Sequence, residues 1–147
     1  MRPAPWNFLF IAVVFLACAS CNDVQERHFD TLDAAKQQHM IEKGWIPAFA
    51  PSDAKDINVE GDLDKTRVYG SYDSKDTALL RQHCSAAEDS FKVPGYGTKW
   101  FRDDLKKAET AAQVRLQGYE VLRCDNRGFN VAILDSRNIV YFWSVRK

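Results

Sequence analysis

The chain has 147 residues, of which 46% are hydrophobic and 27% charged, values typical of one globular domain once a leader is removed. Lysine plus arginine and aspartate plus glutamate each number 20, so the formal net charge is zero. This balance gives no electrostatic case for a nucleic-acid partner and none for a polybasic membrane patch. A partner must therefore be recognised by shape and local chemistry.

The N-terminal segment has the pattern of a signal peptide. One basic residue, Arg2, precedes an unbroken apolar run over residues 8–18. The run is too short to span a bilayer, which needs about 20 residues, and polar sequence begins abruptly at Asn22. We therefore expect export with removal of residues 1–20, and a location in a bacterial cell envelope, facing the periplasm.

The end of this segment, Leu-Ala-Cys-Ala-Ser-Cys over residues 16–21, resembles the lipobox of bacterial lipoproteins. Cys21 follows two small residues, Ala19 and Ser20, but has Cys18 at the position where leucine is usual. Cys18 is itself a competing lipidation site. Ordinary signal-peptidase cleavage after Ala19 is a third option.

Cysteine parity favours Cys21 as the lipidated residue. Only Cys84 and Cys124 lie in the part expected to fold, and an oxidising compartment favours a disulfide between them. Lipid on Cys21 then leaves no odd thiol, whereas either alternative leaves Cys21 unpaired. Several acyl chains would make the anchor stable, where a single chain is marginal. The expected partners are thus the lipid bilayer and an envelope protein.

The sequence after the cleavage site predicts a polar tether over residues 21–28 and a single globular domain over residues 29–147. The domain opens with residues typical of a helix. Thr31 is a candidate N-cap, and residues 32–43 are rich in helix formers. We expect this helix to end at Gly44.

A loop, a strand and a second helix are expected next. Residues 44–57 have the prolines typical of a loop, and residues 67–72 alternate bulky side chains as a strand does. Asp73 or Ser74 could cap a helix over residues 75–83.

The last third of the chain gives the clearest pattern. Residues 86–99 have the composition of an irregular segment, and residues 101–112 predict a helix with a thin apolar face. Three β-rich runs follow at residues 119–124, 129–135 and 139–145, separated by short turn signals that predict an antiparallel meander. We expect an α+β fold, with a small antiparallel sheet of about four strands and two or three helices packed on one face.

The run Gly-Trp-Ile-Pro-Ala-Phe-Ala-Pro-Ser-Asp-Ala over residues 44–54, followed by Gly-Asp-Leu-Asp-Lys-Thr, resembles a set of uncharacterised bacterial proteins, many of them lipoproteins. The two later cysteines, the tryptophan at position 100 and the final Tyr-Phe-Trp strand also fit, so the resemblance covers residues 30–143. Lys65 interrupts the Asp-Leu-Asp-Thr stretch of that pattern, and Ala50 stands where leucine is more usual. The resemblance implies a fold and an envelope address but no activity.

An acidic stretch resembles the start of a calcium-binding EF-hand loop. Asp56, Asn58 and Glu60 alternate before Gly61. The chemistry requires a bidentate carboxylate at position twelve of the loop, where this chain has Arg67. We therefore expect a solvated acidic turn here, with no metal and no cofactor.

No catalytic motif survives inspection. The histidines His28, His39 and His83 lack metal-binding spacing, and the cysteines form no Cys-x-x-Cys motif. Asp62 and Asp64 could act as an acid–base pair only if a third polar group, such as His83, converged on them in a pocket. We expect the protein not to be an enzyme.

Aromatic residues in loops are the remaining candidates for a site. Trp45, Tyr96, Trp100 and Phe101 lie beside proline or glycine, where aromatics often form recognition surfaces. The competing interpretation is that Trp45 and Trp100 close the ends of a small core.

These observations favour an envelope lipoprotein with a non-catalytic binding or structural domain. The alternative is an inhibitor or immunity-type lipoprotein that blocks a periplasmic enzyme or toxin. Such an inhibitor would present the loop at residues 93–100 to its target.

Overall fold

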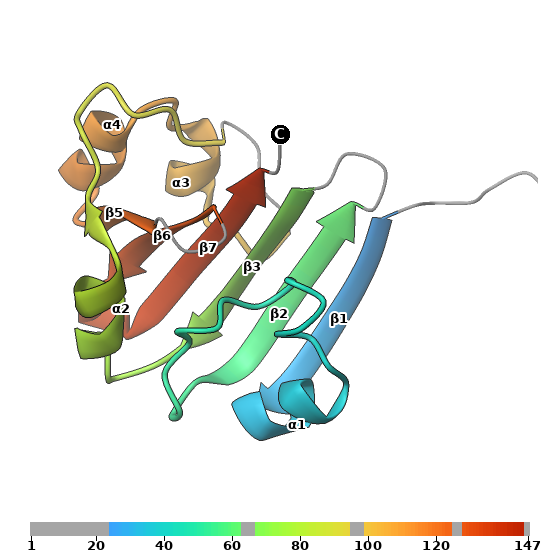
Figure 1. The fold of residues 1–147 in the computed structure, drawn as a ribbon. Helices are drawn as coiled ribbons and strands as arrows, with labels where there is room; N and C mark the ends of the chain where they lie inside the picture. Colours follow the sequence, from blue (N-terminus) through green and yellow to red (C-terminus); the bar gives the residue numbers. More distant parts are fainter. Residues whose placement is uncertain (1–23, 63–66, 95–98, 125–127, 146–147) are drawn as a thin grey trace, which may run out of the picture.

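The computed structural model describes residues 24–62, 67–94, 99–124 and 128–145. In these ranges the chain forms one seven-stranded antiparallel sheet in the order β1-β2-β3-β7-β6-β5-β4 (Figure 1). The strands are β1 Val24–Thr31, β2 Lys55–Asp62, β3 Arg67–Asp73, β4 Ser85–Ala86, β5 Glu120–Cys124, β6 Phe129–Leu134 and β7 Ile139–Val145. The helices are α1 Leu32–Gln37, α2 Ala78–His83, α3 Asp103–Lys107 and α4 Ala111–Leu116, with a 3₁₀ turn, η1, at Asp135–Arg137. No helix among the described residues is long and apolar enough to cross a membrane.

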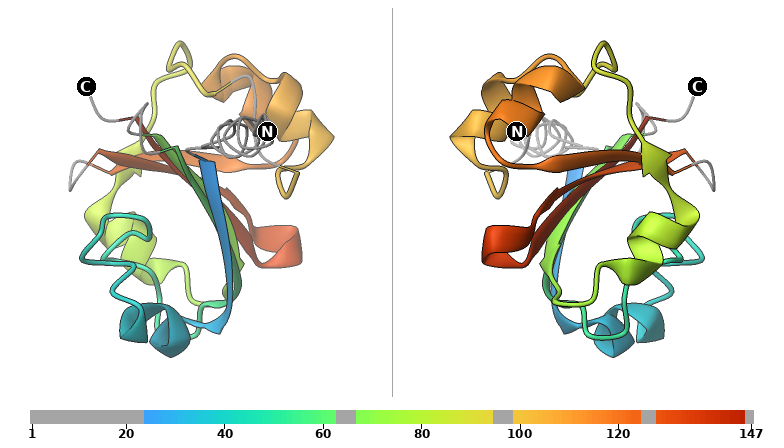
Figure 2. Two further views of the ribbon diagram at one scale, coloured as in Figure 1. Left: turned by 90° about the vertical axis from the view of Figure 1, so that its right-hand side faces the viewer. Right: turned by 90° about the vertical axis from the view of Figure 1, so that its left-hand side faces the viewer.

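Helices cover both faces of the sheet (Figure 2). On one face α1, α2 and the segment of residues 38–54 pack on a core that includes Trp45, Ile57 and Phe142. On the other face α3 and α4 pack on a second core, which includes Tyr141 and Trp143. The sheet is therefore the middle layer of three.

This architecture corrects the expected one, since a sheet of about four strands with helices on one face is wrong. The physical reason lies in β5, β6 and β7, where consecutive side chains are buried on opposite faces. In β7, Tyr141 and Phe142 are 2% and 0% exposed and belong to different cores. A strand that is apolar on both faces needs a covering layer on each.

Two strands had no clear signal in the sequence. Residues 24–28, expected as part of a tether, are the first residues of the edge strand β1, in which only Phe29 is buried. The acidic stretch expected as a turn is strand β2. There Ile57 and Val59 point into a core while Asn58 and Glu60 are half-buried, so the stretch has the period of a strand.

The first helix is shorter than expected. Thr31 does cap it, because its hydroxyl accepts a hydrogen bond from the Ala34 amide at 3.3 Å. The helix ends at Gln37, well before Gly44, because His39 adopts a left-handed backbone with φ of 59°. The chain then turns back over the sheet and buries Met40.

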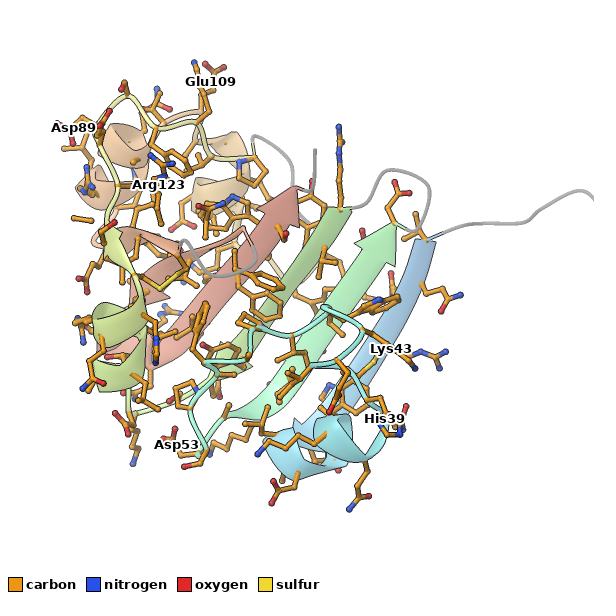
Figure 3. All side chains as sticks on the ribbon, viewed as in Figure 1. His39, Lys43, Asp53, Asp89, Glu109 and Arg123 are labelled. Carbon is orange, nitrogen blue, oxygen red and sulfur yellow. A yellow bond between two sulfur atoms is a disulfide. The ribbon has the colours of Figure 1, made fainter. Side chains whose placement is uncertain are left out.

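The other helices also begin or end at unexpected residues. Helix α2 starts at Ala78, because Ser74 is engaged elsewhere and does not cap it. Its hydroxyl donates to the Asp53 carboxylate at 2.6 Å, and the amides of Lys75 and Asp76 donate to the same carboxylate at 2.9 and 3.3 Å. Asp53, labelled in Figure 3, thereby joins the segment before β2 to the turn after β3.

The helix expected over residues 101–112 is divided into α3 and α4. Arg102 and Tyr119 hold the first of these in place. The Arg102 guanidinium and the Tyr119 hydroxyl, the latter at 3.0 Å, donate to the Asp104 carboxylate. Burial acts to raise the pKa of Asp104, but these hydrogen bonds outweigh it and lower the pKa.

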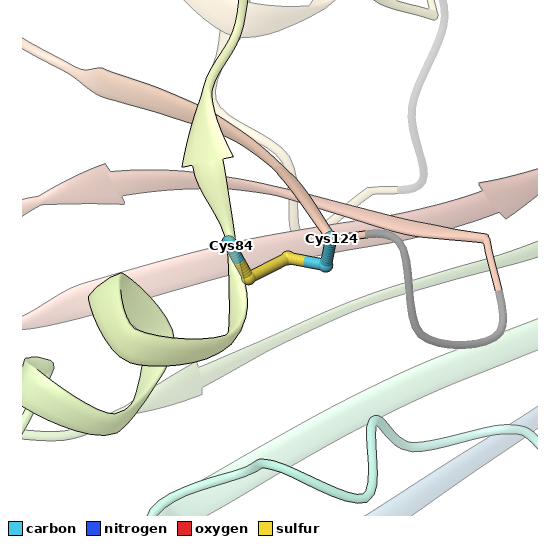
Figure 4. Close-up of a disulfide and its surroundings, with 2 residues drawn as sticks. All are labelled: Cys84 and Cys124. Carbon is cyan, nitrogen blue, oxygen red and sulfur yellow. A yellow bond between two sulfur atoms is a disulfide. The ribbon is translucent and has the colours of Figure 1, made fainter.

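A disulfide joins Cys84 to Cys124, as the cysteine parity predicted (Figure 4). Cys84 lies between α2 and β4, and Cys124 ends β5. The bridge closes a sequence separation of 40 residues beside the two-residue strand β4, which has few ladder hydrogen bonds of its own. The disulfide therefore holds β4 against β5 at this edge of the sheet.

Replacing both cysteines with serine should lower the free energy of unfolding by about 3–4 kcal/mol, because the unfolded chain regains the entropy of the open loop. Urea denaturation without reductant measures this change. Reductant should destabilise the wild type and leave the double variant unaffected. Equal denaturation midpoints for the two proteins without reductant would contradict the prediction.

Candidate functional site

Two of the four predicted partner-binding aromatics belong to the cores. Phe101 is 2% exposed and packs edge-on against Tyr141. Trp45 is 9% exposed and lies on β2 at Gly61, where an added Cβ would be 2.8 Å from the Trp45 ring. Neither offers a large exposed surface, because each fills a gap between the sheet and a loop.

Trp100 is the most exposed of the three predicted aromatics that the structure describes. Its side chain is partly exposed, and the Lys99 ammonium lies 5.2 Å from its ring centroid. Lys99 also makes an ion pair with Glu26 of β1 at 2.7 Å, so the segment before α3 reaches across to the far edge of the sheet. Tyr96 lies outside the described residues.

One part of the sheet has no helix over it. Helices α3 and α4 lie over β5 to β7, and this same face of β1 and β2 has no helical cover among the described residues (Figures 1 and 2). The register places Glu26 opposite Glu60 and His28 opposite Asn58, so these four side chains share this face. We call them the polar face.

His28 is the centre of a hydrogen-bonded group on the polar face. Its Nδ1 lies 3.0 Å from the Asn58 side-chain oxygen and 3.7 Å from an Asp56 carboxylate oxygen, and its Nε2 lies 3.4 Å from Asp30. The Asn58 amide donates to the Asp56 backbone carbonyl at 3.0 Å, which fixes the orientation of that amide. These contacts join β1 to β2 at the left-handed residue Asp56, whose φ is 49°.

Burial and neighbouring carboxylates raise the pKa of two acidic side chains on and beside the polar face. Burial raises the pKa of the Glu60 carboxyl, and the charges of Glu26 and Asp62 raise it further, while Lys99 lowers it. Burial and then the charge of Asp56 likewise raise the pKa of Asp73, at the end of the neighbouring strand β3. Carboxylates here repel one another, so a cation that approached them would be attracted.

The structure places His83 and Asp62 in different parts of the fold. His83 ends α2 and stacks on Phe49, with ring centroids 6.0 Å apart, on the face that α1 and α2 cover. Asp62 ends β2, near the edge of the sheet opposite to β4. Asp64 lies outside the described residues, and within them no group of three or more histidine, cysteine, aspartate or glutamate side chains could hold a metal ion.

Sequence reasoning missed the polar face as a unit. Its residues come from two strands, one expected as a tether and one as a turn. The available signal was the alternation in β2, where Ile57 and Val59 separate Asn58 from Glu60.

Comparison with protein families finds a match to part of the chain. Residues 23–73 match the family model of the YbbD head domain, which is less than half of the chain. The matched segment contains β1, α1, β2 and β3, and therefore both strands of the polar face. Neither curated proteins nor solved structures gave a match.

Glu60→Gln should stabilise the protein at neutral pH by less than about 1 kcal/mol, the scale of surface charge effects. A carboxyl with a raised folded-state pKa favours folding below its ordinary pKa, 4.5 for glutamate, and loses that contribution as the pH rises through the folded-state pKa. The variant should therefore lose less stability than the wild type between about pH 4 and 7. Urea denaturation across this range measures the difference.

Glu88→Gln is the matched control, since Glu88 is exposed and makes no ion pair in the described part of the chain. An identical pH profile for both variants would contradict the role of the acidic surroundings of Glu60.

Proposed function

We propose that the protein is a bacterial envelope lipoprotein, anchored through Cys21, whose domain binds another envelope protein without catalysis. The observation that carries this proposal is the position of β1. The strand begins at Val24, only three residues after Cys21. Three residues span at most about 10 Å, so lipid on Cys21 would hold the edge of the sheet close to the bilayer surface.

The disulfide supports an extracytoplasmic address. Bridges such as Cys84–Cys124 form and persist in oxidising compartments and are rare in the cytosol. With this pair joined, Cys21 stays available for lipid. The signal-peptide pattern before Cys21 adds an independent argument from the sequence.

The polar face is the surface we propose for the partner. Glu26 and Glu60 lie side by side there, and Asp30 and Asp56 flank His28. Lys99 is the cation nearest to Glu26. A partner with a basic surface would complement this charge, and recognition of this kind raises the association rate and gives specificity.

The alternative is an inhibitor that acts through the segment at residues 93–100. One feature favours it, since buried Val93 and Phe101 fix the two ends of that segment on the second core while Lys99 stays exposed. Inhibitors use loops held by a rigid scaffold in this way. We rank the inhibitor second, because the contacts described above involve more residues of the polar face than of the segment at residues 93–100.

Intact mass of the membrane-extracted protein tests the anchor. The wild type should carry the mass of an acylated Cys21 and be two protons lighter without reductant than with it. Cys21→Ser should lose the acyl mass and leave the membrane fraction. An unacylated wild-type product that starts at Ser20 would contradict the proposal and indicate a released domain. Acylation that persists in Cys21→Ser would place the lipid on Cys18.

Photo-crosslinking in intact cells tests the binding surface. A photoreactive residue at His28 should capture a discrete partner protein, and high salt should abolish capture because the contact is electrostatic. The matched control is the same residue at Lys107, which is exposed on α3, away from the polar face. Capture from Trp100 and not from His28 would favour the inhibitor instead.

A further inference from the structure

A pocket lies on the other side of β1 from the polar face. It has a volume of about 360 Å³, within the usual range for ligand sites. The side chains that line it are Gln25, Arg27, Gln38, Met40, Lys43 and Trp45. Met40 and Trp45 are buried and form an apolar floor, whereas the other four are exposed and form a polar rim.

The wall of the pocket is held by backbone hydrogen bonds. The amides of Trp45 and Ile46 donate to the Met40 carbonyl at 2.9 and 3.2 Å, and the Lys43 amide donates to the His39 carbonyl at 3.0 Å. His39 and Lys43 lie on this segment beside β1 (Figure 3). A site formed in advance loses little conformational entropy when it binds.

His39 gives this wall its shape. Its left-handed backbone, with φ of 59°, turns the chain between Gln38 and Met40, both of which line the pocket. A residue other than glycine adopts this conformation at a cost, and such strain persists where the surrounding structure maintains it.

The charge of the pocket is positive. Arg27 and Lys43 both line it, and no carboxylate does. Within the described residues neither cation makes an ion pair, so both charges are available to a ligand. Two cations over an apolar floor suit a ligand with an anionic group and an apolar body.

We propose that this pocket binds a phosphate or carboxylate group attached to an apolar body. Arg27 offers a planar guanidinium that pairs with two oxygens of such a group, and Lys43 offers a second, compact charge. The apolar body packs on Met40 and the Trp45 ring. The anchoring of Trp45 on Gly61 keeps that ring in place when the pocket fills.

Two sources could supply this chemistry. Gln25, on the rim, is four residues from Cys21, so in the anchored protein an anionic lipid headgroup would lie within reach. A soluble phosphorylated or carboxylated compound is the other source. The binding chemistry of the pocket does not require the lipid anchor. The proposed site can therefore be tested independently of the proposed function.

Nuclear magnetic resonance of the full chain, expressed with Cys21→Ser to release it from lipid, tests the site. Phenyl phosphate should shift the indole N–H signal of Trp45, whereas benzyl alcohol, which has the ring without the charge, should not. Arg27→Gln combined with Lys43→Gln should weaken phenyl phosphate binding at least tenfold. Vesicles of phosphatidylcholine with and without phosphatidylglycerol identify the source, since displacement of phenyl phosphate by the anionic vesicles alone indicates a lipid headgroup.

Lys107→Gln is the matched control, because Lys107 is an exposed lysine outside the pocket. It should leave the affinity unchanged. An equal shift with benzyl alcohol, no shift with phenyl phosphate, or equal weakening by Lys107→Gln would overturn the proposal. Unchanged spectra elsewhere in the double variant would show that it folds.

Discussion

Burial of β7 on both faces is the constraint on which the structure depends. Val140 and Phe142 enter one core, and Tyr141 and Trp143 enter the other, all of them 0–2% exposed. A strand of this kind must lie inside a sheet and between two covering layers. Because β7 pairs with β3, the polar N-terminal strands β1 and β2 extend the same sheet beyond β3. Strands β1 and β2 lie at one edge of this sheet and present polar side chains on one of its faces.

The sequence predicted the fold best where apolar side chains dominate. Strands β5, β6 and β7 and their antiparallel order follow from three β-rich runs and the short turns between them. Strand β1 contains a single buried residue, Phe29, so nothing in its composition separates it from a tether. The first helix was predicted too long because Gly44 is a visible stop, whereas the left-handed turn at His39 depends on the burial of Met40 against the sheet.

The candidate site could be predicted even less. Trp45 and Phe101 are aromatic residues in loops, a pattern that fits exposure and burial equally well, and tertiary packing places both inside. The polar face depends on the register that sets Glu26 opposite Glu60, and a shift of one residue would exchange the faces of β1. Local sequence does not determine that register. The buried residues Phe29 and Ile57, which are paired across the two strands, fix it.

That register also explains why one edge strand can serve two surfaces of different charge. Successive side chains of β1 point to opposite faces, so Glu26 and His28 belong to the polar face while Gln25 and Arg27 line the pocket. Charged side chains on both faces of an edge strand also discourage pairing with a second sheet, because a new neighbour would meet them at once. The same alternation thus protects an unpaired edge and separates acidic from basic chemistry. If Cys21 carries lipid, both surfaces start within a few residues of the membrane, and a ligand on either face of β1 would restrain the strand that joins the domain to its anchor.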